Sequence, residues 1–107
     1  MRRNRRKIHS SLIFKRKINQ VAGCQPRVER SAVSIPSNIA EGQQRKSNKE
    51  FANFLSFARG SLAELETQLL ICVRLGYLKD ESIEKLMNFC KEIGKMINAL
   101  MSKTEAK

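Results

Sequence analysis

A chain of 107 residues, 41% of them hydrophobic, is long enough for one domain with a single core and too short for two. No apolar run approaches the roughly 20 residues of a membrane-spanning helix, and the N-terminus lacks the apolar core of a secretory signal. The formal net charge of +11 points to a polyanionic partner, either nucleic acid or an anionic membrane surface.

Residues 1–26 carry most of this charge. Residues 1–30 contain 10 cations and 1 acid, a balance of +9, whereas the remaining residues contain 11 cations and 9 acids, a balance of +2. A helix over residues 8–22 would place Lys15 in the middle of its apolar side, and Gly23 and Pro26 would end it. We therefore interpret residues 1–26 as a flexible basic arm, with an imperfect first helix as the alternative. Its candidate polyanion-binding residues are Arg2, Arg3, Arg5 and Arg6.

Apolar residues at helical spacing predict the first clear helix within residues 27–42. Gly42 follows them in the place of a C-cap. Pro36 allows two interpretations: it is the first helical residue after a cap at Ser34 or Ile35, which propensity alone favours, or it lies inside a helix that already runs from about Arg27. The linker of residues 43–46 is short, so this helix and the next are expected to be antiparallel neighbours.

Residues 47–77 predict one long helix with both ends marked. Ser47 and Glu50 form an S-x-x-E capping box at its start, and Gly76 suits the left-handed position after its end, where Tyr77 can fold back onto Cys72. At about 1.5 Å per residue the helix is roughly 40 Å long and needs other helices against it. Its apolar residues alternate four and three apart, at Phe51, Leu55, Ala58, Leu62, Leu65, Leu69, Cys72 and Gly76.

The last helix is expected to follow Asp80 as its N-cap, with Glu81 and Glu84 favourable in its first turn. The same four-three spacing returns at Ile83, Met87, Cys90, Gly94, Ile97 and Met101. Leu86, Ile93 and Leu100 widen this apolar face beyond what one neighbour covers, which suggests subunit contacts. The sequence thus predicts an all-α, antiparallel up-and-down bundle over residues 27–103, with a frayed tail at residues 104–107.

The sequence offers no catalytic constellation. His9 is the only histidine and lies in the arm, so we expect no Cys–His or Ser–His pair in the folded part, no Glu-x-x-His metal site, no cofactor and no enzyme activity. Cys72 and Cys90 fall on apolar seams, where a reduced cysteine acts as a small hydrophobe. A reducing, cytoplasmic location fits these cysteines best.

Two groups of polar residues are candidates for a binding role. Asn38 and Glu41 are either ligand contacts or, as we prefer, structural pins that hydrogen-bond the long helix near Arg59, Ser61 or Glu64. Gly60 with Ser61 likewise suggests a close approach between helices.

The second group is a cation cluster where the first clear helix passes into the long one. It consists of Arg45, Lys46 and Lys49, with Arg59 and Arg74 further along the chain. Alone it is typical of a solvated face, but several copies of it in an oligomer would attract phosphates. We expect no aromatic platform beside it, since Phe51, Phe54 and Phe57 are interpreted as core.

Four motifs carry a resemblance to a known family: SIPSNIAEG (34–42), S-x-K-E-F (47–51), FLSFARGSLAELETQL (54–69) and LGYL (75–78). They resemble the bacterial four-helix-bundle family of proteins encoded in intervening sequences of large-subunit ribosomal RNA, whose relatives include the accessory protein of diversity-generating retroelements. The resemblance covers about Gln25 to Met101, whereas Met1 to Cys24 do not resemble the family's first helix. It implies a four-helix bundle with Pro36 inside a helix, and a homopentameric ring with a positively charged surface. In the retroelement branch it implies binding of nucleic acid or of reverse transcriptase.

We therefore expect a non-enzymatic homo-oligomer that binds RNA or DNA electrostatically and has no membrane partner. The alternative is a protein–protein adaptor, such as a reverse-transcriptase accessory protein, that uses the apolar face of the last helix. On that alternative, binding depends on Leu86, Ile93 or Leu100.

Overall fold

The computed structural model describes residues 26–76 and 80–105, and within these ranges the chain is helical without strands. The helices are α2 (Pro26–Gln43), α3 (Asn48–Arg74) and α4 (Asp80–Glu105). The predicted all-α class is therefore confirmed. The proposed basic arm, and the contact of Tyr77 with Cys72, lie outside the described residues.

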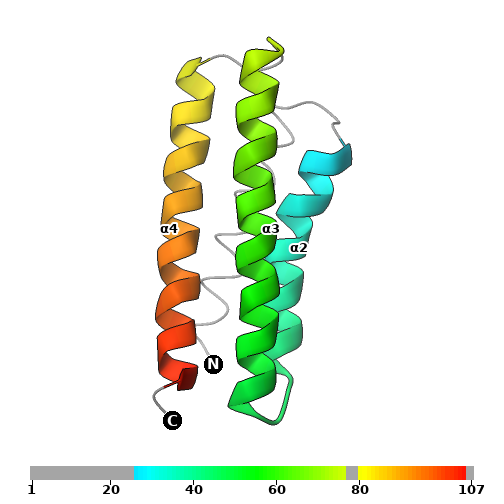
Figure 1. The fold of residues 1–107 in the computed structure, drawn as a ribbon, viewed down its shortest axis with the longest axis vertical. Coiled ribbons are helices and arrows are strands. Elements are labelled where there is room, and N and C mark those ends of the chain that lie inside the picture. Colours follow the sequence, from blue (N-terminus) through cyan, green and yellow to red (C-terminus); the bar gives the residue numbers. More distant parts are fainter. Residues whose placement is uncertain (1–25, 77–79, 106–107) are drawn as a thin grey trace.

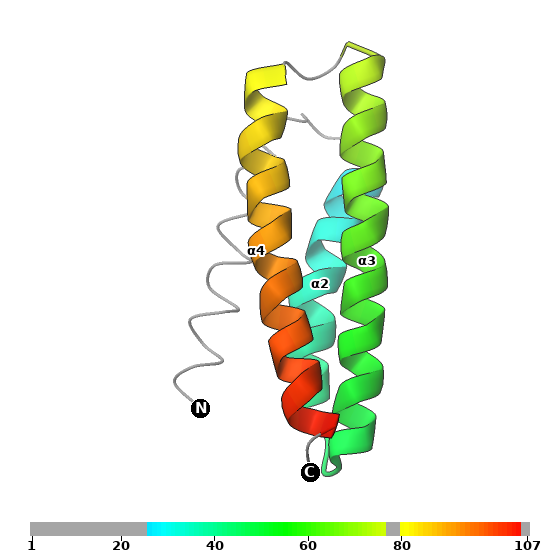
Figure 2. The same ribbon diagram turned by 60° about the vertical axis from the view of Figure 1, so that its left-hand side comes forward.

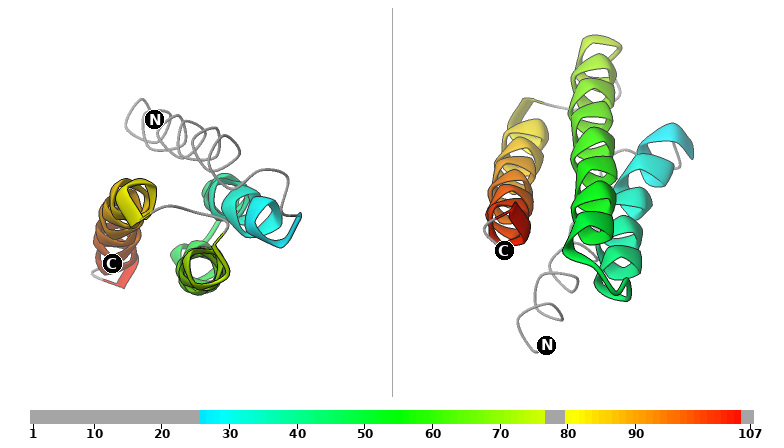
Figure 3. Two further views of the ribbon diagram at one scale, coloured as in Figure 1. Left: turned by 90° about the horizontal axis from the view of Figure 1, so that it is seen from above. Right: turned by 60° about the horizontal axis from the view of Figure 1, so that its bottom comes forward.

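The three helices lie side by side, as Figures 1 and 2 show. α3 packs against both α2 and α4, and the view from above in Figure 3 places the three helices at the corners of a triangle. The α2–α3 connection (residues 44–47) lies at one end of the array, and the C-terminal end of α3 and the N-terminal end of α4 lie at the opposite end (Figure 1). We refer to residues 44–47 as the α2–α3 turn.

Pro36 lies inside α2 and is buried, so the second of the two interpretations of this proline is correct. Proline lacks an N–H and would clash with the preceding turn of a regular helix. Figure 1 shows the N-terminal turns of α2 leaning away from α3. The helix persists because its apolar stripe of Val28, Ala32, Ile35 and Ile39 is buried against α3.

Gly42 does not end α2 as a left-handed C-cap, because the helix includes it and Gly76 is the glycine with positive φ among the described residues. Gly42 is instead buried where α2 meets α3. A Cβ at this position would lie 2.7 Å from the Phe54 Cβ and 2.8 Å from the Phe51 Cδ1. The close approach of the two helices therefore requires glycine here.

The Ser47 half of the predicted capping box and the predicted C-terminal glycine of α3 are both present. The Ser47 side chain accepts a hydrogen bond of 3.1 Å from the Glu50 N–H, which satisfies one free donor of the first turn. At the other end Leu75 is the C-cap, and Gly76 follows at φ +81 with its N–H donating to the Val73 carbonyl.

The core confirms the predicted α3 seam from Leu55 to Cys72, and on α4 it also contains residues that we expected at a partner-binding face. The α3 residues Leu55, Ala58, Leu62, Leu65, Leu69 and Cys72 are all buried. On α4, Leu86, Ile93 and Leu100 are only 2%, 2% and 8% exposed. These three residues belong to the core, so the expectation that they form an exposed partner-binding face is wrong. α3 packs against α4, and the side chains of these three residues are buried within a single chain.

The ends of α4 differ slightly from the prediction. The helix begins at Asp80 itself, one position earlier than an N-cap assignment implies. It continues to Glu105, two residues beyond the expected end of the bundle, and the Thr104 hydroxyl donates to the Met101 carbonyl at 2.7 Å.

Candidate nucleic-acid interface

A polar network links the middle of α2 to the middle of α3. The Ser34 and Ser61 hydroxyls are 2.8 Å apart, and the Asn38 amide donates to the Ser34 hydroxyl at 3.0 Å and to the Ser34 carbonyl at 2.8 Å. The interhelical bond is therefore made by Ser34, while Asn38 supports it from within α2. A structural role for Asn38 and Ser61 agrees with this geometry, but the partner predicted for Asn38 on α3 is wrong.

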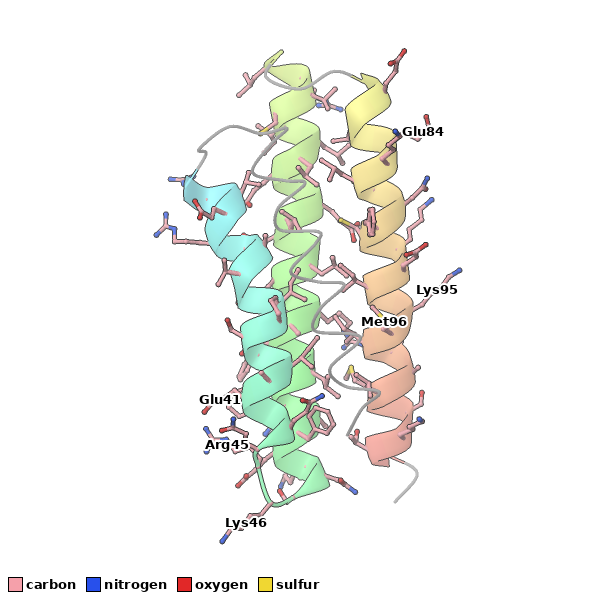
Figure 4. The ribbon with its side chains drawn as sticks, turned by 180° about the vertical axis from the view of Figure 1, so that it is seen from behind. Glu41, Arg45, Lys46, Glu84, Lys95 and Met96 are labelled. Carbon is pink, nitrogen blue, oxygen red and sulfur yellow. The ribbon has the colours of Figure 1, made fainter. Side chains whose placement is uncertain are left out.

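Glu41 is not a pin to α3 either. Its side chain is 53% exposed and pairs with Arg45, one turn further along the chain, at 2.7 Å. Figure 4 shows the two side chains on the same side of the molecule, next to the α2–α3 turn. An exposed pair at this spacing contributes only a few tenths of a kcal/mol, so its main effect is to orient Arg45.

Arg45 also stacks on an aromatic ring of α3. Its guanidinium carbon lies 5.0 Å from the centroid of Phe54, within the range of a cation–π contact. Phe54 in turn meets Phe57 edge to face, with centroids 6.0 Å apart and an interplanar angle of 86°. Phe57 is 60% exposed. The expectation that Phe57 belongs to the core is therefore wrong, and the cation cluster does have an aromatic side chain beside it.

The structure brings together only part of the predicted cation set. Lys46 and Lys49 are exposed close to Arg45, and Figure 4 shows Lys46 extending away from the turn. Arg59 and Arg74 are also exposed, but they lie 10 and 25 residues beyond Lys49, or about 15 and 37 Å along the helix at 1.5 Å per residue. The arginines of residues 2–6 lie outside the described residues.

Two further motif residues face solvent instead of α2. Gly60 is exposed, and a Cβ there would have no neighbour within 4 Å, so this glycine does not mark a close helix approach in this chain. Glu64 is exposed beside a shallow hollow of about 340 Å³ that it lines with Ala63, Thr67 and Gln68. Neither residue contacts the SIPSNIAEG motif as we expected.

Sequence reasoning missed an apolar patch near the C-terminal end of α3. Leu70, Ile71 and Leu75 are 51%, 50% and 64% exposed, and we call them the α3 patch. Thr67, Leu70, Ile71 and Arg74 line a hollow of about 230 Å³ within it. The sequence could have indicated this patch, because Leu70 and Ile71 fall between the seam positions Leu69 and Cys72. They therefore lie on the side of α3 that α2 and α4 leave uncovered.

The described residues provide no cluster of three or more His, Cys, Asp or Glu side chains placed to hold a metal ion. Among these residues, no helix is both long and apolar enough to cross a membrane. Cys72 and Cys90 are buried free cysteines, as predicted. Burial, followed by the charge of Glu66, raises the pKa of the Cys90 thiol from 9.0 to about 12, so Cys90 is a core residue and not a nucleophile.

The part of the chain that the structure describes consists of helices without strands that share one core, which defines an all-helical bundle protein. The chain belongs to the 23S rRNA-intervening sequence protein family, whose model matches residues 6–99. The predicted resemblance is thus confirmed, and the match also includes most of the N-terminal residues that we had excluded from it.

A solved structure supports the same relationship. The chain is similar to a protein of unknown function from the S23 ribosomal protein family of Bacteroides thetaiotaomicron VPI-5482, with 28% sequence identity and a TM-score of 0.80. The similarity covers 89% of this chain and 97% of the other. A search of curated proteins found no match to the chain.

Proposed function

We propose that this protein is a non-enzymatic, cytoplasmic homo-oligomer that binds nucleic acid electrostatically at the α2–α3 turn. The observation that carries the proposal is the grouping of Arg45, Lys46 and Lys49 as exposed cations at one end of the helical array. Glu41 and Glu50 offset two of these three charges, so the turn of one chain is only weakly positive. Several copies of the turn in one assembly would add to a field that attracts phosphates.

The experiment is a salt titration of binding to a fluorescein-labelled structured RNA, measured by anisotropy. Each lysine that neutralises a phosphate contributes about 0.7–0.9 to the slope of log K against log salt. We expect the double variant Lys46→Gln/Lys49→Gln to reduce that slope, while Lys95→Gln, an exposed lysine on α4 (Figure 4), leaves it unchanged. An affinity that barely changes between low and physiological salt would exclude this mode of binding.

We also propose that the chain forms an antiparallel up-and-down four-helix bundle. The family resemblance implies that this bundle assembles into a pentamer. The α3 patch supports self-association, because three adjacent half-exposed aliphatic side chains are unfavourable in water and are suited to burial in a subunit contact. Size-exclusion chromatography with light scattering gives the mass. We expect Leu70→Glu/Ile71→Glu to lower that mass, while Glu64→Gln on the same helix keeps it.

The same patch favours a second function, that of a protein–protein adaptor. Its contact would be Leu70, Ile71 and Leu75 in place of the buried α4 residues that we first considered. A wild-type protein that is monomeric by light scattering and binds no RNA at low salt would support the adaptor over the nucleic-acid binder.

A further inference from the structure

We propose that the α2–α3 turn binds single-stranded nucleic acid by stacking an unpaired base on Phe57. This inference rests on the proposed function and adds to it the form of the ligand and the residue that distinguishes it. The site consists of Arg45, Lys46, Lys49, Asn53 and Phe57, and we call it the turn site.

The first support is the exposure of Phe57 beside cations. The Phe57 side chain is 60% exposed on α3, and its ring contacts that of Phe54. The guanidinium carbon of Arg45 lies 5.0 Å from the centroid of the Phe54 ring. A ring in this setting offers a π-face for a base, while the neighbouring cations attract the phosphates that flank it. A protein partner that buried Phe57 would also have to desolvate these charges, which favours a nucleotide over an apolar peptide.

The second support is the order of side chains along α3. Lys49, Asn53 and Phe57 are four residues apart and therefore lie above one another on one face of the helix, all three exposed. They rise by about 12 Å. Lys49 can contact a phosphate, the Asn53 amide can contact a base edge, and the Phe57 ring can stack on a base. These three groups follow one another along α3, as phosphates and bases follow one another along a single strand.

The third support is that the ring is oriented in advance and its surroundings are open. The edge-to-face contact with Phe54 at 86° holds the plane of Phe57. Gly60, one turn further on, provides no side chain, and the space where its Cβ would lie is empty to 4 Å. A planar base can therefore approach from the Gly60 side.

Stacking on Phe57 should allow the turn site to discriminate between single-stranded and duplex nucleic acid. Bases inside a duplex have both faces covered by their neighbours, so only an unpaired base can use Phe57, whereas the lysines attract both forms. The turn site should accordingly prefer a short adenine oligoribonucleotide to a duplex RNA of equal length. A matched oligodeoxynucleotide shows whether the 2′-hydroxyl contributes.

The test uses the full chain and measures anisotropy for both RNA probes. We expect Phe57→Ala to weaken single-strand binding about fivefold or more, from the usual contribution of one stacked base, with little change for the duplex. Lys46→Gln should weaken both, and Lys95→Gln neither. Because Phe57 is mostly exposed and loses only its contact with Phe54, Phe57→Ala should lower the melting temperature by only a few degrees and stay folded at the assay temperature, which separates lost binding from lost folding.

A second readout follows from the absence of tryptophan in this chain. The variant Phe57→Trp should retain single-strand affinity, and its tryptophan fluorescence should be quenched by the single strand but not by the duplex. Quenching by both probes, or by neither while the single strand is bound, would overturn the inference.

The outcomes separate the inference from the function on which it rests. If Phe57→Ala leaves single-strand affinity unchanged while Lys46→Gln lowers it, stacking is refuted and electrostatic binding stands. If the wild type binds neither probe at low salt, the proposed function fails. If Phe57→Ala instead lowers the mass measured by light scattering, Phe57 belongs to a subunit contact and the inference is also refuted.

Discussion

Replacing Gly42 with alanine should destabilise the protein, although alanine is normally the better helix former. The new Cβ would lie 2.7 Å from the Phe54 Cβ and 2.8 Å from the Phe51 Cδ1, both closer than Cβ atoms approach other atoms in proteins. The Phe54 Cβ is attached directly to the α3 backbone and cannot swing aside. α2 and α3 must therefore move apart to admit one methyl group.

The magnitude is the difference between two effects. Overpacking of a tight contact typically costs about 1–3 kcal/mol, and two simultaneous overlaps, one of them against the immobile Phe54 Cβ, place Gly42 in the upper half of that range. The higher helix propensity of alanine relative to glycine stabilises the variant by at most about 1 kcal/mol, which offsets part of this cost. The expected net loss of unfolding free energy is about 1–2 kcal/mol, which lowers the melting temperature of a domain of this size by about 4 °C or more.

The assay is thermal and urea unfolding followed by far-UV circular dichroism, with Gly60→Ala as the matched control. Both glycines lie inside helices, but a Cβ at Gly60 meets nothing within 4 Å. Gly60→Ala should therefore gain up to about 1 kcal/mol, and the two variants should move in opposite directions. A Gly42→Ala protein as stable as the wild type would refute the reasoning.

Three other predictions test the fold. Ser34→Ala should cost about 1–2 kcal/mol because it removes the partner of both Ser61 and Asn38, and a double-mutant cycle with Ser61→Ala should show coupling in urea unfolding. Gly76→Ala should cost about 1–2 kcal/mol, measured in the same way, because φ +81 is unfavourable for alanine; a neutral effect would contradict the assigned cap. Cys90 should resist alkylation at pH 8 and react on unfolding, as peptide mass spectrometry can show. Its raised pKa adds stability that is complete below pH 9 and declines as pH rises from 9 towards 12, because the unfolded thiol ionises first.

The helices and the core of α3 could be predicted from sequence because both follow from local periodicity. Positions four and three apart share one face wherever the chain is helical, so Leu55, Leu62 and Leu69 could be placed in the core without knowing the partner helix. The caps at Ser47 and Gly76 are equally local, since each involves hydrogen bonds within a few residues.

The faces of α4 and the environment of Phe57 could not be predicted in this way. Whether Leu86 and Leu100 are core or surface depends on how many helices surround α4, which its own sequence does not specify. Phe57 has an apolar side chain of the kind found in cores, but it lies two positions after the seam residue Leu55 and therefore projects to another side of α3. Side-chain type alone could not distinguish the two outcomes.

The polar partners were missed for a related reason. Asn38 lies beside the apolar stripe of α2, but its amide is short enough to reach the preceding turn of its own helix before it reaches α3. Glu41 has an arginine four residues away and pairs with it. When a local partner and a distant one compete, the helix geometry already holds the local partner in place, so no further ordering of the chain is required.

Gly42 connects the fold to the turn site. Arg45 belongs to the α2–α3 turn and Phe54 to α3, and they stack only because the helices approach closely at Gly42. Forcing the helices apart there should therefore separate Arg45 from Phe54 and move this cation away from the turn site. Gly42→Ala is expected to lower stability and single-strand affinity together, whereas Phe57→Ala lowers mainly the affinity. A Gly42→Ala protein that lost stability but bound single strands like the wild type would show that the turn site does not depend on this close approach.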